Sequence, residues 1–104
     1  MAIRDITAAE FEAAVATGVS LVDFWATWCG PCKMQGAILE TKLAPEHPEL
    51  NILKVDVDSN PELAAQFGVQ SIPTLLIIRD GKLVKQFVGV TPPDEILAAI
   101  GTAG

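Results

Sequence analysis

The sequence predicts an α/β protein in which a mixed sheet lies between two layers of helices. Short, strongly apolar runs typical of buried strands alternate along the chain with segments that have the spacing of helices. The run 21–26 is apolar on both faces, which places its strand in the centre of the sheet. Further along, Asp80-Gly81 is typical of a two-residue hairpin turn, so part of the sheet is expected to be antiparallel.

The first helix is expected to begin at Thr7 and to stop at Gly18. Thr7 and Glu10 have the spacing of a capping box, and Ile6 and Phe11 have the spacing of a hydrophobic staple. A glycine just past the last helical turn is a common stop signal. The buried stripe of this helix is predicted to comprise Phe11, Ala14 and Val15.

The strand 21–26, the second of the sheet, carries one carboxylate, Asp23. Because the run stays apolar beyond Asp23, we expect this side chain to be buried; the alternative is a carboxylate near solvent at the end of the strand. Burial would raise its pKa. Such a group could exchange protons with a thiol six or nine residues further on, at Cys29 or Cys32.

The next helix is predicted to end near Ala44, because the residue before Pro45 avoids helical angles. Its inward side chains are expected to be Met34, Ile38, Leu39 and Leu43. The following strand, 52–57, places Lys54 among apolar residues. Lys54 therefore calls for an anionic partner, and Asp23 is the candidate; the alternative is a side chain whose ammonium reaches solvent.

Residues 56–60 look like the start of an EF-hand calcium loop, but the match fails. The sixth position of such a loop is Gly and here is Pro61, and the twelfth is Glu and here is Phe67. Asn60 is instead predicted to be the N-cap of a short helix with Pro61 in its first turn. That helix is expected to run to Phe67 and to stop at Gly68.

Two further strands, 74–78 and 83–88, are predicted on the two sides of the hairpin turn. Lys85 and Gln86 within the second of them make it an edge strand. A final helix is expected after the capping sequence Thr91-Pro92-Pro93-Asp94. Its inward residues are predicted to be Ile96, Leu97 and Ile100.

Length and charge limit the classes of function. The 104 residues are expected to form one domain, 1–104, and to act as a monomer. The formal net charge of −6 is opposite to the charge that nucleic-acid binding favours. No apolar run approaches the roughly 18 residues of a membrane span, and the N-terminus has no signal-peptide core. We therefore expect a cytoplasmic protein that binds neither nucleic acid nor membrane.

The only two cysteines, Cys29 and Cys32, lie between a predicted strand and a predicted helix. A Cys-x-x-Cys pair at such a junction is typical of a redox site, because its short ring can close into a disulfide. Backbone N–H groups at the start of the helix also favour the thiolate of the first cysteine. Pro31 suits the first helical turn, where the N–H that it lacks would have no partner.

Other interpretations of the cysteine pair are less consistent with the sequence. A structural zinc site needs four ligands, and the chain has no second cysteine pair and a single histidine, His47. A structural disulfide over so short a ring would constrain the unfolded chain very little. Two inert buried thiols would not explain the Gly-Pro between them or Trp28 before them. The pair therefore favours redox chemistry.

Several stretches together match the pattern of one known family: Val22 to Ala26, Trp28 to Met34, Asn60-Pro61, Gly68-Val69, Ser71 to Thr74 and Val88-Gly89. On these stretches the chain resembles the thioredoxin family over nearly its whole length. The resemblance implies a central mixed five-stranded sheet flanked by four helices on both faces. It also implies a cis peptide bond before Pro73, which would place the backbone of Ile72 beside Cys29.

The resemblance implies roles for individual residues. Cys29 would be the exposed nucleophile that attacks a substrate disulfide, and Cys32 the buried thiol that resolves the mixed disulfide. Asp23 would be the buried acid/base for Cys32, acting through water, with Lys54 tuning it. The surface that docks substrates would be flat and mostly apolar, and would comprise Trp28, Gly30, Pro31, Ile72, Pro73, Gly89 and Val90.

The resemblance further implies a protein-disulfide reductase that maintains cell redox homeostasis and holds no cofactor beyond its redox-active Cys29–Cys32 disulfide. Electrons would come from NADPH through the flavoprotein thioredoxin reductase. They would pass to oxidised proteins such as ribonucleotide reductase, peroxiredoxin and methionine sulfoxide reductase. Two alternatives are a disulfide oxidase or isomerase of the same fold, against which Gly30-Pro31 argues, and a non-catalytic interaction subunit that uses the docking surface.

The helix after Cys32 departs from the family pattern. Members usually carry a proline five residues after the second cysteine, where this chain has Ala37 preceded by Gly36. Because an interior proline removes a hydrogen bond and bends the axis, Ala37 predicts a straighter, fully hydrogen-bonded helix. The inward Ile or Val that often comes shortly before this proline is also absent, and Gln35 stands two residues ahead of Ala37. The early contacts of this helix are therefore not predicted.

Overall fold

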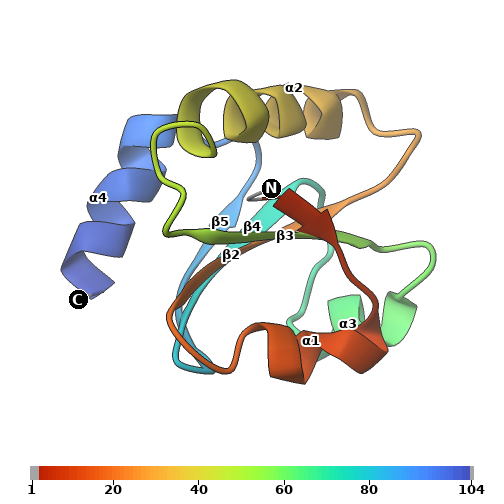
Figure 1. Ribbon diagram of the computed structural model, residues 1–104. Coiled ribbons are helices and arrows are strands. Elements are labelled where there is room, and N and C mark those ends of the chain that lie inside the picture. The colour runs from red at the N-terminus through yellow and green to blue at the C-terminus, as the bar shows by residue number, and fades with distance from the viewer. Residues whose placement is uncertain (1–2, 104) are drawn as a thin grey trace.

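The computed structural model describes residues 3–103 and has a mixed five-stranded sheet between helices, as predicted (Figure 1). The strands of the sheet are β1 (Ile3–Asp5), β2 (Val19–Trp25), β3 (Asn51–Asp56), β4 (Thr74–Arg79) and β5 (Lys82–Val88). Their order across the sheet is β1-β3-β2-β4-β5. β3 pairs in parallel with β1 and β2, whereas β4 pairs antiparallel with β2 and β5. The predicted central position of β2 is confirmed.

Two helices cover each face of the sheet. Figure 1 shows α1 (Ala8–Ala14) and α3 (Pro61–Gln66) on one face, and α2 (Gly30–Ile38) and α4 (Pro93–Ala103) on the other. Alternate residues of each strand therefore enter different cores. Val22 and Phe24 of β2 pack in the core under α1 and α3, whereas Leu21 packs in the core under α2 and α4. Strand alternation then places Asp23, like Leu21, on the face that α2 covers.

The first strand and the first helix show how short elements are held at the edge of this fold. No bounds were predicted for β1, whose three residues are mostly exposed. The capping box of α1 is confirmed, because the backbone N–H of Thr7 donates to Glu10 Oε1 over 2.9 Å. The expected stop at Gly18 is wrong, since α1 already ends at Ala14.

Gly18 belongs instead to the turn that leads into β2, where it meets the hairpin between β4 and β5. The N–H of Gly18 donates to Asp80 Oδ1 over 2.7 Å, and the N–H of Asp80 donates to the Gly18 carbonyl over 2.9 Å. Asp80 and Gly81 have φ values of 49° and 84°, as a two-residue hairpin turn requires. The predicted hairpin is confirmed, and β5 lies at the edge of the sheet.

The buried face of α2 differs from the predicted one. Cys32, Gln35 and Gly36 are buried, whereas Met34 is 62% exposed, so its predicted inward position is wrong. Helical spacing explains the difference, because residues three, four and seven after Cys32 share its face and Met34 does not. No position was predicted for Gln35, which is the polar residue that takes the buried place on this face. Leu39 and Leu43, which follow on the same face, are buried as predicted.

The helix does not stay regular beyond Ile38. α2 is α-helical through Ile38, but residues Leu39–Leu43 form a π-helical turn, in which Ala44 N–H donates to the Leu39 carbonyl over 2.8 Å. The segment around Ala37 is therefore α-helical as predicted, and the π-helical turn that follows it was not predicted. The end of the helical segment at Ala44, before Pro45, is confirmed.

Asn60 precedes α3 as predicted, but its side chain does not cap that helix. Its Oδ1 accepts from the N–H of Ala8, in the first turn of α1, over 2.9 Å, and its Nδ2 donates to the Asp56 carbonyl over 3.0 Å. The first N–H groups of a helix have no partner within it. Asn60 therefore supplies an acceptor to α1 and ties α1 to the end of β3.

We predict that Asn60→Ala lowers the free energy of unfolding by about 1–3 kcal/mol, because it leaves Ala8 N–H and the Asp56 carbonyl without this partner. Urea denaturation followed by tryptophan fluorescence measures the change. Ser59→Ala, at the neighbouring exposed position, is the control and should change stability by less than about 0.5 kcal/mol. Equal stabilities of the two variants would show that the Asn60 side chain is not a tie between the two elements.

Candidate functional site

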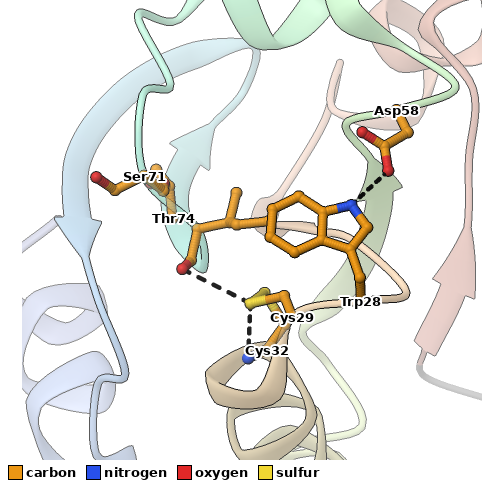
Figure 2. The surroundings of a disulfide bond; sticks show 7 residues. Trp28, Cys29, Cys32, Asp58, Ser71 and Thr74 are labelled. Atoms are coloured by element: carbon orange, nitrogen blue, oxygen red, sulfur yellow. Dashed lines mark hydrogen bonds between the residues drawn. A yellow bond between two sulfur atoms is a disulfide. The ribbon is translucent and has the colours of Figure 1, made fainter.

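The two cysteines form a disulfide at the start of α2 (Figure 2). Cys29 is the residue before the helix, and Pro31 lies in its first turn as predicted. The backbone N–H of Cys32 donates to Cys29 Sγ over 3.2 Å. A donor of this kind, at the positive end of a helix, stabilises negative charge on the sulfur that accepts it. The local geometry therefore favours a thiolate on Cys29 when the disulfide is reduced.

Exposure alone does not distinguish the two cysteines. Cys29 is 5% exposed and Cys32 is 4% exposed, so the expectation that Cys29 is the exposed thiol is wrong for the disulfide form. Their surroundings do differ. Cys29 Sγ lies 3.7 Å from the carbonyl oxygen of Ile72, whereas Cys32 lines a cavity that reaches Lys54.

The segment opposite Cys29 has the predicted backbone. The bond between Ile72 and Pro73 is cis, and the hydroxyl of Thr74 donates to the Ser71 carbonyl over 2.6 Å, which closes the turn around it. Gly89 N–H donates to the Pro73 carbonyl over 2.8 Å. The predicted position of the Ile72 backbone beside Cys29 is confirmed.

The residues predicted to form the docking surface differ in exposure. Trp28 is 69% exposed, and its indole Nε1 donates to Asp58 Oδ2 over 2.8 Å, which fixes the ring (Figure 2). Val90 is 40% exposed and Ile72 is half-buried. Of the other residues predicted there, Gly30 and Pro31 are exposed, Gly89 is half-buried, and Pro73 is buried and contributes only backbone shape.

The carboxyl group of Asp23 is buried as predicted, and neither of its oxygens has a hydrogen-bond partner. Burial raises the pKa of Asp23 to about 7, although the ammonium of Lys54 acts in the opposite direction. Asp23 and Lys54 are opposite each other in the pairing of β2 with β3. The carboxyl group is therefore neutral or charged according to small changes in pH near neutrality.

The predicted ion pair between Asp23 and Lys54 is wrong. Both residues lie in the described part of the chain, and no nitrogen–oxygen contact within 4.0 Å joins them. Lys54 Nζ lies instead over the ring of Trp25, 4.3 Å from its centre. The face of the indole ring attracts the ammonium electrostatically. Lys54 therefore acts on Asp23 through space rather than by contact.

Gln35 is a buried residue of this site that the sequence did not identify as functional. Its Nε2 donates to the Thr91 carbonyl over 3.1 Å, and its Oε1 accepts from the Thr91 N–H over 2.7 Å. The signal that could have found it is position: Gln35 follows Cys32 by three residues, so it shares the inward face of α2. A polar residue on that face requires partners.

Residues 3–103 contain neither a group of candidate metal ligands nor a helix that could span a membrane. No three side chains from His, Cys, Asp and Glu gather there in a way that could hold a metal ion. In the same part of the chain, each helix is too short or too polar to cross a bilayer.

Comparison with known proteins agrees with this geometry. The family model described as Thioredoxin matches residues 2–102. Thioredoxins of Staphylococcus aureus strains Mu50 and MW2 are each 50% identical over 96 residues, which cover 92% of this chain and 92% of theirs. A solved mutant thioredoxin from Halobacterium salinarum superposes with a TM-score of 0.87 at 33% identity, over 96% of this chain and 88% of that one.

The pKa of Asp23 predicts how stability depends on pH. The folded pKa, about 7, exceeds the unfolded value of about 3.9, so the folded state binds the extra proton between these pH values. The contribution of the neutral carboxyl to stability is fully present below about pH 4. It is lost as pH rises to about 7, with a slope of up to about 1.4 kcal/mol per pH unit.

We therefore predict that Asp23→Ala is more stable than wild type at neutral pH and that its advantage grows as pH rises from about 4 to 7. Urea denaturation at a series of pH values measures the difference. Ser20→Ala, which removes a buried but uncharged polar group from the same strand, should give a difference that does not vary with pH. A constant difference for Asp23→Ala as well would contradict the raised pKa.

Proposed function

The chain belongs to the thioredoxin family, and we propose that it reduces disulfide bonds in other proteins. With the Cys29–Cys32 pair, membership of this family makes the protein a thiol–disulfide oxidoreductase. The observation that carries the proposed direction and substrate is the position of Cys29 Sγ, 3.7 Å from the Ile72 carbonyl and bordered by exposed apolar side chains. An extended peptide could pair with that backbone and present its own disulfide to the sulfur.

In the proposed reaction the thiolate of Cys29 attacks one sulfur of the substrate disulfide. A bond forms between Cys29 and that sulfur, and the other substrate sulfur leaves as a thiolate that takes up a proton. The thiolate of Cys32 then attacks Cys29 Sγ. The mixed disulfide breaks, the second substrate sulfur leaves as a thiol, and the Cys29–Cys32 disulfide forms. Two electrons thus pass from the protein to the substrate.

The Cys32 thiol must lose its proton before the second step. We assign this proton to Asp23, acting through water, because the carboxyl is buried on the face of β2 that α2 covers and its pKa lies near neutrality. Lys54 tunes this carboxyl from its place on Trp25. The cavity beside Cys32, which Trp25, Gly36 and Lys54 help to line, gives water a route to the sulfur.

The proposed substrate surface comprises Trp28, Gly30, Pro31, Ile72, Gly89 and Val90 on either side of Cys29, with the backbone at Pro73. The geometry supports a flat docking face rather than a deep pocket, which suits a protein substrate. The proposed electron source is NADPH by way of thioredoxin reductase. The proposed setting is the cytoplasm, where a single-domain monomer would serve targets such as ribonucleotide reductase, peroxiredoxin and methionine sulfoxide reductase.

We predict that Cys29→Ser abolishes the reduction of insulin disulfides, because the attacking sulfur is lost. Cys32→Ser should form a stable mixed disulfide with insulin, since nothing then resolves it; mass spectrometry of the non-reduced adduct measures this. The double variant is the control and should form no adduct. An adduct through Cys32 in the Cys29→Ser protein would reverse the assigned roles.

We also predict that the resolution step depends on Asp23. Its rate in the wild type should rise as pH passes through about 7, when the carboxyl becomes an available base. Stopped-flow tryptophan fluorescence follows the step. Asp23→Asn should lose this titration, whereas Ser20→Ala should retain it. A wild-type profile in Asp23→Asn would mean that Asp23 does not handle the proton.

A further inference from the structure

We infer that Gln35 is a positioning residue that fixes the loop 89–91 to the redox helix and thereby favours protein disulfides over small ones. The inference rests on the proposed function. Gln35 is completely buried, and both ends of its amide bond the backbone of Thr91, at 3.1 Å and 2.7 Å. One side chain thus satisfies both backbone polar groups of a residue 56 positions away in sequence.

Hydrogen bonds hold the loop on both sides of Val90. Gly89 N–H donates to the Pro73 carbonyl over 2.8 Å, and the Thr91 hydroxyl donates to the Gly89 carbonyl over 3.0 Å. Gln35 holds the far end of the loop. Thr91 is buried while Val90 is 40% exposed, so these bonds direct the backbone inward on both sides of an outward apolar side chain.

The second partner of the loop is the helix that carries the cysteines. Gln35 lies one turn beyond Cys32 on the buried face of α2. The Pro73 carbonyl, which holds Gly89, belongs to the segment beside Cys29. The loop is therefore hydrogen-bonded both to the helix that carries Cys32 and to the segment beside Cys29. The position of a substrate that contacts Val90 is thereby fixed with respect to Cys29 Sγ.

This arrangement acts differently on two kinds of substrate. A polypeptide that spans the docking surface contacts the loop and the Ile72 backbone together, so its attack geometry depends on the loop. A small disulfide needs access only to Cys29 Sγ. Removing the Gln35 amide would leave the N–H and carbonyl of Thr91 buried without partners, and the loop would have to move to hydrate them.

The test compares single-turnover rate constants of the reduced protein with insulin and with 5,5′-dithiobis(2-nitrobenzoic acid). Gln35→Met keeps the side-chain length and removes the amide. Its insulin-to-small-disulfide rate ratio should fall about tenfold, the effect of losing about one buried hydrogen bond. Asn51→Leu is the matched control, because it removes an amide that donates to the Ala14 carbonyl at the opposite end of the sheet. Its ratio should stay at the wild-type value.

Gln35→Glu provides a second readout if Gln35→Met does not fold. A protonated carboxyl can accept from Thr91 N–H and donate to the Thr91 carbonyl, whereas an ionised one cannot donate. The rate ratio of this variant, divided by that of the wild type at the same pH, should be near one in acid and should fall as pH rises. A normalised ratio that is independent of pH would overturn the inference.

Failure of the inference and failure of the proposed function give different results. Wild-type protein that reduces the small disulfide but not insulin contradicts the proposed function. Backbone amide exchange then still tests the loop, because the Thr91 N–H should lose protection in Gln35→Met and keep it in Asn51→Leu. Insulin reduction by wild type with equal rate ratios in Gln35→Met and Asn51→Leu overturns the role of Gln35 alone.

Discussion

The burial of β2 on both faces is the constraint on which the rest of this structure depends. One parallel neighbour, β3, and one antiparallel neighbour, β4, pair with its backbone, and helices cover its side chains on both faces. The chain leaves the sheet at the carboxyl end of β2, and there it turns into α2. Cys29 occupies that turn. The sulfur chemistry is therefore placed by a strand that is buried on both faces, whereas Trp28, Ile72 and Val90 beside it lie in loops.

The same burial gives the site its electrostatic character. The carboxyl of Asp23 is buried on the inner face of β2 and its oxygens have no hydrogen-bond partner, so it ionises only near neutral pH. The nearby ammonium is held by an aromatic ring rather than by that carboxyl. Had Lys54 bonded Asp23 directly, the charge on Asp23 would be fixed and its proton harder to move. Because Lys54 does not bond Asp23 directly, the carboxyl can change between its protonated and ionised forms near neutral pH.

Most of the fold and the central chemistry could be predicted from sequence because they follow local rules. The two-sided apolar run around Asp23, the Asp80-Gly81 turn and the cysteine pair each have one strong physical interpretation. The errors arose where three-dimensional contacts decide. Met34 is apolar but falls off the buried face, and Gln35 is polar but finds a backbone partner far along the chain. Hydropathy alone cannot anticipate such a partner.

The wrong prediction of the partner of Lys54 also arose from a contact that depends on the three-dimensional structure. Strand alternation correctly placed Lys54 opposite Asp23, but the choice between a carboxylate and an aromatic face depends on side-chain geometry that no sequence pattern encodes. Asn60 is similar, since its capping position was predicted while its bond to Ala8 depends on how α1 packs beside α3. The docking surface was predicted from the family resemblance, and its exposure could be judged only from the fold.

The two hydrogen bonds between Gly18 and Asp80 bear on the register of β4 and so on the position of Ile72 beside the disulfide. They lie at one end of β4, and Ile72 lies just before the other end. A one-residue slip of β4 would break both bonds, exchange its side chains between the two cores and displace the strand by about 3.4 Å. That displacement is nearly the whole 3.7 Å between Cys29 Sγ and the Ile72 carbonyl. The two bonds at the opposite end of β4 therefore help to hold the register that places the Ile72 carbonyl beside the reactive sulfur.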